Sequence, residues 1–169
     1  MRQHFQMFAA YNRWANALLY EAADQLDDEE LNRNAGGFFG SLFGTMSHIL
    51  VADRIWLHRF TGQGPTYKAL DARPCDNFAD LALARAAEDE RIVTWIGGLN
   101  DEQLEATIAY TPVSNPVPVS HMLAPGLSHF FNHQTHHRGQ CHMTLTALGK
   151  PSLSLDLLYF LRQKGQAWL

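Results

Sequence analysis

Apolar side chains recur every three or four positions over most of the chain, which is the spacing that places them on one face of an α-helix. Four long helices are predicted from this pattern, at about residues 3–26, 41–60, 77–96 and 120–148. Ser41, and either Asp76 or Asn77, are suitable N-caps for the second and third of them. A last short helix is predicted at about residues 154–164.

The segments between these helices are irregular in composition. Residues 27–30 are acidic and predict either a solvated turn or a short helical start, while residues 34–37 and 61–76 predict loops. Residues 107–111 alternate and are rich in β-branched side chains, and residues 113–119 repeat this character, so a small hairpin is plausible before the last long helix. The sequence therefore predicts an all-α fold, a four-helix bundle that forms a single domain over residues 1–169. The long segment before the fourth helix allows a helix order other than simple up-and-down.

Charge changes this picture in two ways. The third helix carries the densest run of charges and is therefore expected to be the most exposed of the four: Arg85, Glu88, Asp89, Glu90 and Arg91. The net charge of −4 and the scattered basic residues give no positive patch for nucleic acid or for an anionic membrane.

No apolar run is long enough to cross a bilayer, and no secretory signal is apparent at the start of the chain. With only two cysteines, a soluble protein in the reducing cytoplasm is the expectation.

Histidine is the residue type that points to chemistry, because nine occur in 169 residues. His133 and His137 are four positions apart in a predicted helix, so both imidazoles project from one face and could bind the same metal ion. His48 lies in the middle of the apolar second helix and could supply a third ligand. The alternative is that the pair arises by chance and that His48 is a hydrogen-bonded core residue. Spacing alone leaves both readings open.

Other polar residues are further candidates for the site. His129 lies one turn before His133 and could be a fourth ligand, a donor to a ligand, or a side chain at the mouth of a pocket. Asn12 and Asn16 on the first helix could contact the pocket, although Asn12 could equally be exposed. Arg138 and Gln140 could fix the orientation of His137 or of a neighbouring helix. The remaining histidines and Cys141 are expected to be surface, packing or small core residues: His4, His58, His121, His136 and His142.

Three separated blocks resemble the DinB family. Residues 129–140 resemble its NHxTxHRGQ motif, and residues 11–16 and 40–60 look like its other two hallmarks, in the same order along the chain. The resemblance implies a DinB/YfiT-like four-helix bundle, usually dimeric, with metal ligands at positions that match His48, His133 and His137. It also implies a divalent transition metal, commonly zinc or nickel, and thiol-dependent transferase or isomerase chemistry with bacillithiol, mycothiol or glutathione.

Three functions follow from these residues and the resemblance. Three neutral imidazoles leave a coordination position open, which is typical of a catalytic metal site. The first hypothesis is therefore thiol S-transfer to a small electrophile, in which Asn16 orients the substrate. Metal-assisted hydrolysis is the second, and it is weakened because position 134 is Gln rather than the Glu of an HExxH motif. The third is a non-catalytic, metal-stabilised ligand-binding or stress protein. No residue is assigned as a catalytic acid, base or nucleophile, and the expected partners are a small-molecule substrate and a second copy of the chain.

Overall fold

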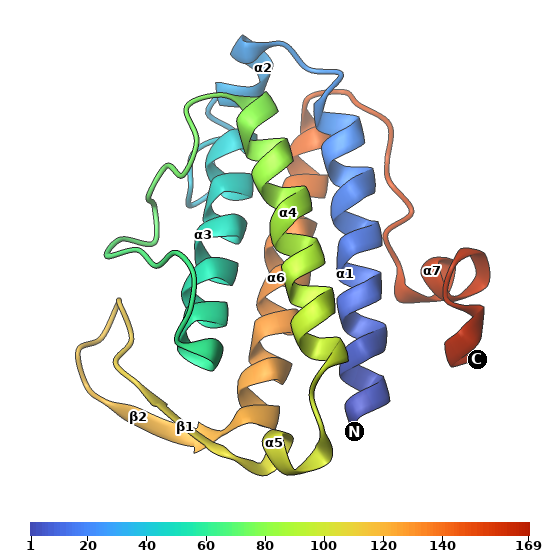
Figure 1. The fold of residues 1–169 in the computed structure, drawn as a ribbon. Helices are drawn as coiled ribbons and strands as arrows, with labels where there is room; N and C mark the ends of the chain where they lie inside the picture. The colour runs from blue at the N-terminus through green and yellow to red at the C-terminus, as the bar shows by residue number, and fades with distance from the viewer.

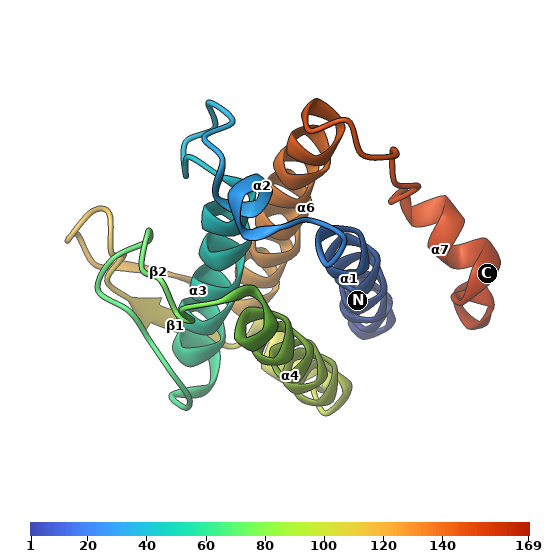
Figure 2. The ribbon, with the colours of Figure 1, turned by 90° about the horizontal axis from the view of Figure 1, so that it is seen from above.

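The computed structural model describes residues 1–169 and has four long helices packed along one another (Figure 1). They are α1 (Arg2–Ala23), α3 (Leu42–Thr61), α4 (Phe78–Gly97) and α6 (Leu123–Ala147). Contacts join α1 to α4, α4 to α3, α3 to α6 and α6 back to α1, so the helices form a closed ring when seen from above (Figure 2). The predicted all-α bundle is confirmed.

The direction of the helices departs from simple up-and-down order. In Figure 1, α1 and α6 run upward while α3 and α4 both run downward. Since α3 and α4 are parallel neighbours, residues 62–77 have to return along the length of the bundle before α4 can begin. The direction therefore departs from simple up-and-down order at the connection between α3 and α4. The segment between α4 and α6, on which the sequence prediction placed the departure, joins two helices that run in opposite directions.

Capping residues decide where the helices begin and end. The Ser41 hydroxyl accepts a hydrogen bond from the Gly44 amide, and the Asn77 side chain accepts one from the Asp80 amide, as predicted. Gly62 ends α3 with a φ of 70°, a left-handed conformation that favours glycine. The first helix ends at Ala23, three residues before the predicted boundary.

Several short elements complete the fold. Two five-residue helices each begin with a capping box, and a hairpin of two strands precedes the last long helix: α2 (Asp28–Asn32), α5 (Asp101–Glu105), β1 (Thr107–Tyr110) and β2 (Val119–Met122). The hairpin prediction is confirmed, but its second strand lies later than residues 113–119. Because Ser120 pairs with Ala109 in this hairpin, α6 begins at Leu123 and not at Ser120. The C-terminal helix α7 (Leu157–Gln163) is shorter than predicted, and a 3-10 turn (Gln166–Trp168) follows it.

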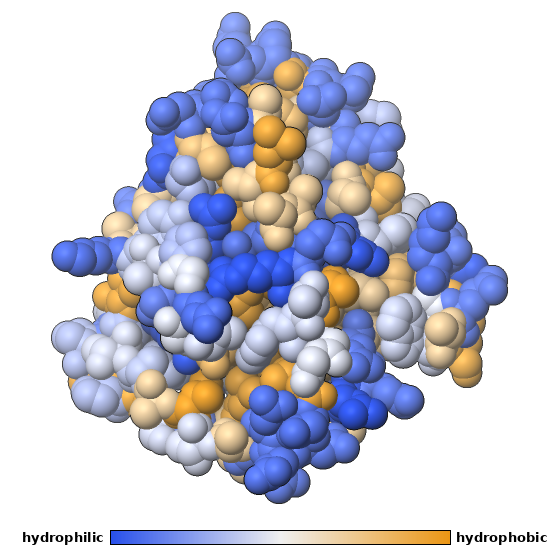
Figure 3. Space-filling view, viewed as in Figure 1, coloured by the Kyte–Doolittle hydropathy of each residue, from blue (hydrophilic) through white to orange (hydrophobic).

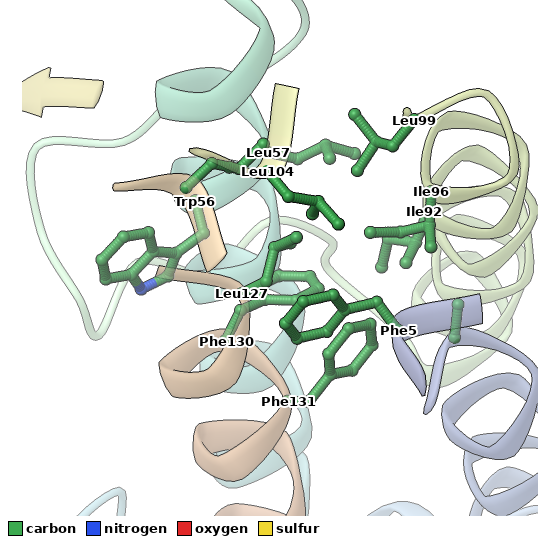
Figure 4. Close-up of a cluster of buried hydrophobic side chains, with 12 residues drawn as sticks. Phe5, Trp56, Leu57, Ile92, Ile96, Leu99, Leu104, Leu127, Phe130 and Phe131 are labelled. Atoms are coloured by element: carbon green, nitrogen blue, oxygen red, sulfur yellow. The ribbon is translucent and has the colours of Figure 1, made fainter. Parts of the chain in front are cut away.

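The apolar core has two large clusters within the bundle and a small third one, in which Tyr11 and Ala15 of α1 pack against residues of α7. The lower cluster joins the start of α1 and α6 to the ends of α3 and α4, with Phe5, Ile96 and Phe130 among its members (Figure 4). The upper cluster joins the opposite ends of the same helices, with Leu19, Leu50 and Leu145 among its members. Burial of these side chains is the main force that holds the four helices together.

A buried polar layer separates the two large clusters and links all four long helices. Arg85 of α4 binds Asp53 of α3 at 2.6 Å and Asp89 of its own helix at 3.1 Å. Asn16 of α1 donates to Asp89 at 3.0 Å, and Arg138 of α6 donates to Asn16 at 3.2 Å. All five side chains are buried. Every long helix therefore supplies at least one member of a connected network.

The expectation that the charged run of α4 is exposed is wrong for three of its residues. Arg85, Glu88 and Asp89 are buried, because they face the other helices, where each charge finds a partner. Glu90 is exposed, and Figure 3 shows hydrophilic side chains interspersed with smaller apolar areas on the face formed by α1 and α4. None of the helices has the length and apolarity needed to span a membrane.

The buried ion pairs predict an unequal response to loss of two arginines. Arg85→Met should lower the free energy of unfolding by about 3–5 kcal/mol, because Asp53 and Asp89 are left buried without their counter-ion. Arg13→Met is the matched control, since Arg13 pairs with Glu90 at 2.8 Å on the surface, and it should cost less than about 1 kcal/mol. Urea denaturation at pH 7 measures both, and equal losses would contradict a structural role for the layer.

The same comparison has a predicted pH dependence. Burial raises the pKa of Asp53 to about 6 and also raises the pKa of Asp89, in spite of the nearby Arg85. Removal of Arg85 should raise both values further, so the folded state takes up protons at a pH where the unfolded state does not. The stability deficit of Arg85→Met should therefore shrink as the pH falls from 7 to 5, whereas the small effect of Arg13→Met should stay constant.

Candidate metal centre

Three histidines meet where α3 packs against α6. His48 comes from α3, and His133 and His137 lie one turn apart on α6. Each offers one ring nitrogen, and these three nitrogens all lie within 4.8 Å of one another. His48 is buried, while His133 and His137 are partly accessible, so the group is open on one side.

The ring of His48 is fixed on two sides. Its Nδ1 lies 2.8 Å from the carbonyl oxygen of Leu70, which can only accept, so Nδ1 carries the proton and Nε2 keeps its lone pair. The ring of Phe39 stacks on the imidazole with centroids 3.8 Å apart. These contacts aim Nε2 at His133, whose own Nε2 is 3.3 Å away.

His137 is oriented by its own helix. Its Nδ1 donates to Oε1 of Gln140 at 2.7 Å, which leaves Nε2 free. Arg138 turns the other way, into the buried layer, where it donates to Asn12 and Asn16 of α1. The sequence left two roles open for Arg138 and Gln140. In the structure Gln140 orients His137, and Arg138 binds the neighbouring helix α1.

Burial keeps the three imidazoles uncharged. It lowers the pKa of His48 to about 4, and burial together with the neighbouring histidines lowers the pKa of His133 to about 3. The pKa of His137 is also lowered by burial. All three rings are therefore neutral at pH 7, which is the form that binds metals.

These distances fit a divalent transition ion. Two nitrogens bound at 2.0–2.1 Å in a tetrahedral site lie about 3.3 Å apart, which is the separation of the His48 and His133 nitrogens. The third nitrogen is within 4.8 Å of both, so a small side-chain adjustment brings it into range. Imidazole donors suit zinc, nickel, copper and iron, and the group contains no carboxylate. The three histidines could thus hold a metal ion.

A pocket of about 280 Å³ opens beside the three histidines. Its walls come from α3, α6 and the segment that includes the hairpin, and they include His48, His133, His129, Trp56, Arg59 and Tyr110. His129 is exposed, with its ring centroid 5.8 Å from that of His133 and 4.9 Å from that of Trp56. Its nitrogens are outside the group that could share one ion, so the structure places His129 on the pocket wall.

The other residues singled out from the sequence lie elsewhere. Asn12 is buried, not exposed, and both Asn12 and Asn16 bind Asp89 in the polar layer, away from the residues that line this pocket. His142 accepts a hydrogen bond from the Leu153 amide, and His136 is exposed. The structure therefore does not bring Asn16 to the histidines.

Sequence reasoning missed four residues that shape this site. Leu70 contributes a backbone oxygen and Phe39 a ring, both from loops, and nothing in their local sequence indicates these roles. Arg59 and Tyr110 meet only because the hairpin folds over the end of α3. The spacing of Arg59 from His48, eleven positions on one helix, is the one signal that could have placed it on the same face.

Comparison with known proteins identifies the family of this chain. The sequence model of the DinB family matches residues 1–167. The chain is also similar to Protein DinB of Bacillus subtilis (strain 168), with 24% identity over 166 residues that cover 92% of this chain and 93% of the relative. Since the family match covers nearly all of the sequence, the resemblance noted from its motifs is confirmed, and this chain belongs to the DinB family.

Proposed function

We propose that the protein is a metal-dependent enzyme that transfers a low-molecular-weight thiol to a small electrophile. The observation that carries this proposal is the convergence of three neutral imidazoles from two helices, two of which, His48 and His133, line an open pocket. The proposed metal is zinc or nickel, which agrees with the imidazole donors and with family membership. Three protein ligands leave room for at least one exchangeable ligand, as in catalytic sites.

The chain would contribute binding and orientation. His48, His133 and His137 would hold the ion, and its Lewis acidity would lower the pKa of a coordinating thiol so that the thiolate forms at neutral pH. The Leu70 carbonyl and Gln140 keep two of the rings aimed at a common point. The apolar parts of the pocket wall, such as Ile55 and Trp56, exclude water from the reacting groups.

Hydrolysis is less well supported because the site lacks a carboxylate that could act as the general base. The side chain at position 134 is Gln, and it is fully buried among the residues of the polar layer. No Asp or Glu lines the pocket beside the histidines. A water molecule there would have no carboxylate to take its proton, and a thiol, which is far more acidic than water, needs less assistance to ionise.

Two further parts of the proposal concern where and how the protein works. A homodimer is proposed from the family resemblance and from exposed apolar side chains on and after α7, such as Leu158 and Leu169. A cytoplasmic location is proposed because Cys75 and Cys141 are free thiols. The proposed partners are a small molecule and a second chain, with neither nucleic acid nor membrane.

Metal binding is tested by the content of untagged protein purified without a nickel column. Wild-type protein should hold one divalent ion per chain, and His48→Ala and His137→Ala should hold almost none, because each variant leaves only two ligands. His136→Ala is the matched control, since this exposed residue lies beside His137 but outside the group. Unchanged metal content in the two ligand variants would remove the proposed centre.

Thiol transfer is tested with bacillithiol, mycothiol and glutathione and a bimane electrophile that fluoresces on conjugation. At least one thiol should react faster with the metal-loaded protein, and the acceleration should disappear on chelation and return when zinc or nickel is added. Circular dichroism of the chelated protein separates the alternatives. A metal-free bundle that stays folded and loses the acceleration would support catalysis, and unfolding on chelation would indicate a structural ion. Absence of acceleration with every thiol in the metal-loaded protein would exclude the transferase.

A further inference from the structure

The pocket beside the histidines contains a positive charge that no acidic residue neutralises. Arg59 of α3 lines this pocket, yet it takes part in none of the ion pairs of the structure. The other ionisable groups on the pocket wall are Tyr110 and three histidines, none of which is acidic at pH 7. An unpaired guanidinium at a pocket wall is unusual, because arginines in such places are normally paired with an anion.

Arg59 and His48 lie on the same face of α3. Positions 48, 52, 55 and 59 follow the spacing of one helical face, and all four line the pocket. A long side chain on a helix leans toward the N-terminal end, so Arg59 reaches back toward the histidines. The guanidinium carbon lies 4.6 Å from the centre of the Trp56 ring, one turn closer to His48.

Two aromatic rings hold this side chain in place. Its guanidinium also lies 4.3 Å from the centre of the Tyr110 ring, which the hairpin brings over the end of α3. Trp56 belongs to the lower apolar cluster, which fixes its position. It lies at the edge of that cluster, and its indole points away from the other members (Figure 4). The two ring centres are 5.1 Å apart and the rings are inclined at 71° to each other, so both rings approach the guanidinium from one side and leave its other side free for a ligand.

We propose that Arg59 binds a carboxylate group of the small molecule that occupies this pocket, while the other end of that molecule reaches the three histidines. The proposal rests on the proposed function, which identifies the end of the molecule at the histidines as a thiol sulfur. Trp56 is eight positions after His48, which is about 12 Å along the helix, so sulfur and carboxylate are separated by roughly 8–12 Å. The substrate class is therefore an elongated thiol with a terminal carboxylate.

The chemistry of the wall favours a carboxylate over a phosphate. A guanidinium edge matches the two oxygens of a carboxylate in a bidentate pair. Arg59 is the only Arg or Lys that lines the pocket, so a doubly charged phosphate would be left partly uncompensated. Burial lowers the pKa of Arg59, but an arginine remains charged at every pH of interest, and a bound carboxylate would restore the interactions that burial removes.

The test compares matched ligands that differ only in the distal charge. Zinc-loaded protein of measured metal content is titrated in a calorimeter with mercaptooctanoate and with mercaptooctanol, two eight-carbon thiols of similar length. Wild-type protein should bind the acid about tenfold more tightly than the alcohol. Arg59→Met should bind both equally, with unchanged metal content and an unchanged affinity for the alcohol.

A second charge variant serves as the control. Arg33→Met removes the same charge from an exposed residue whose only ion pair is with Glu29, and it should keep the full preference for the acid. Arg59→Lys keeps the charge but loses the bidentate edge, so it should keep only part of the preference. Equal binding of the two thiols by wild-type protein, or a preference that survives in Arg59→Met, would overturn the proposal.

A second ligand pair separates this proposal from the thiol function. The monohydroxamate of suberic acid and octanohydroxamate bind metals without a thiol, and they again differ in the distal carboxylate. If neither thiol binds but the suberic acid derivative is preferred in wild type and not in Arg59→Met, the carboxylate site stands and thiol binding is wrong. If this pair also shows no dependence on Arg59, the carboxylate site is wrong whatever the thiols do.

Discussion

The buried ion pair between Arg85 and Asp53 is the interaction on which the geometry of the bundle depends. Apolar side chains pack in more than one register, whereas a buried charge that loses its partner costs several kcal/mol, so the pair selects one alignment of α3 and α4. Asp89 and Arg138 extend this selection to α1 and α6. The four helices are thereby fixed relative to one another at the middle of the bundle.

The buried polar layer also fixes the positions of the three histidines of the candidate metal centre. Gln134 and Arg138 belong to the layer and directly follow His133 and His137 in the sequence, while Asp53 follows His48 by five residues on α3. Each imidazole is therefore close, along its own helix, to a residue whose position is fixed by charge or by burial. The rotation of α6 that directs Arg138 inward also directs His137 toward α3, so one helix contact determines both arrangements.

Much of this could be predicted from the sequence, because the relevant signals are local. The long helices follow from apolar periodicity and from caps such as Ser41, and the histidine pair follows from a four-residue spacing. The burial of Arg85 and Asp89 could not be predicted, since a charged run on a helix has the same sequence whether it faces water or a partner on another helix. Contacts of Leu70 and Tyr110 depend on how loops fold over α3, and local spacing carries no information about that.

The electrostatics of the pocket connect the two proposals. Neutral imidazoles do not cancel the charge of a divalent ion, and the pocket adds one further positive charge at Arg59 and no negative one. A site of this kind attracts anions and discriminates against cations and neutral molecules of the same shape. A thiolate at one end and a carboxylate at the other would supply negative charge at the two positive places, the metal ion and Arg59. Two fixed points are enough to set the direction in which an elongated ligand lies. The same arrangement would leave the remaining pocket volume, along Ile55 and Val113, for the apolar part of an electrophile.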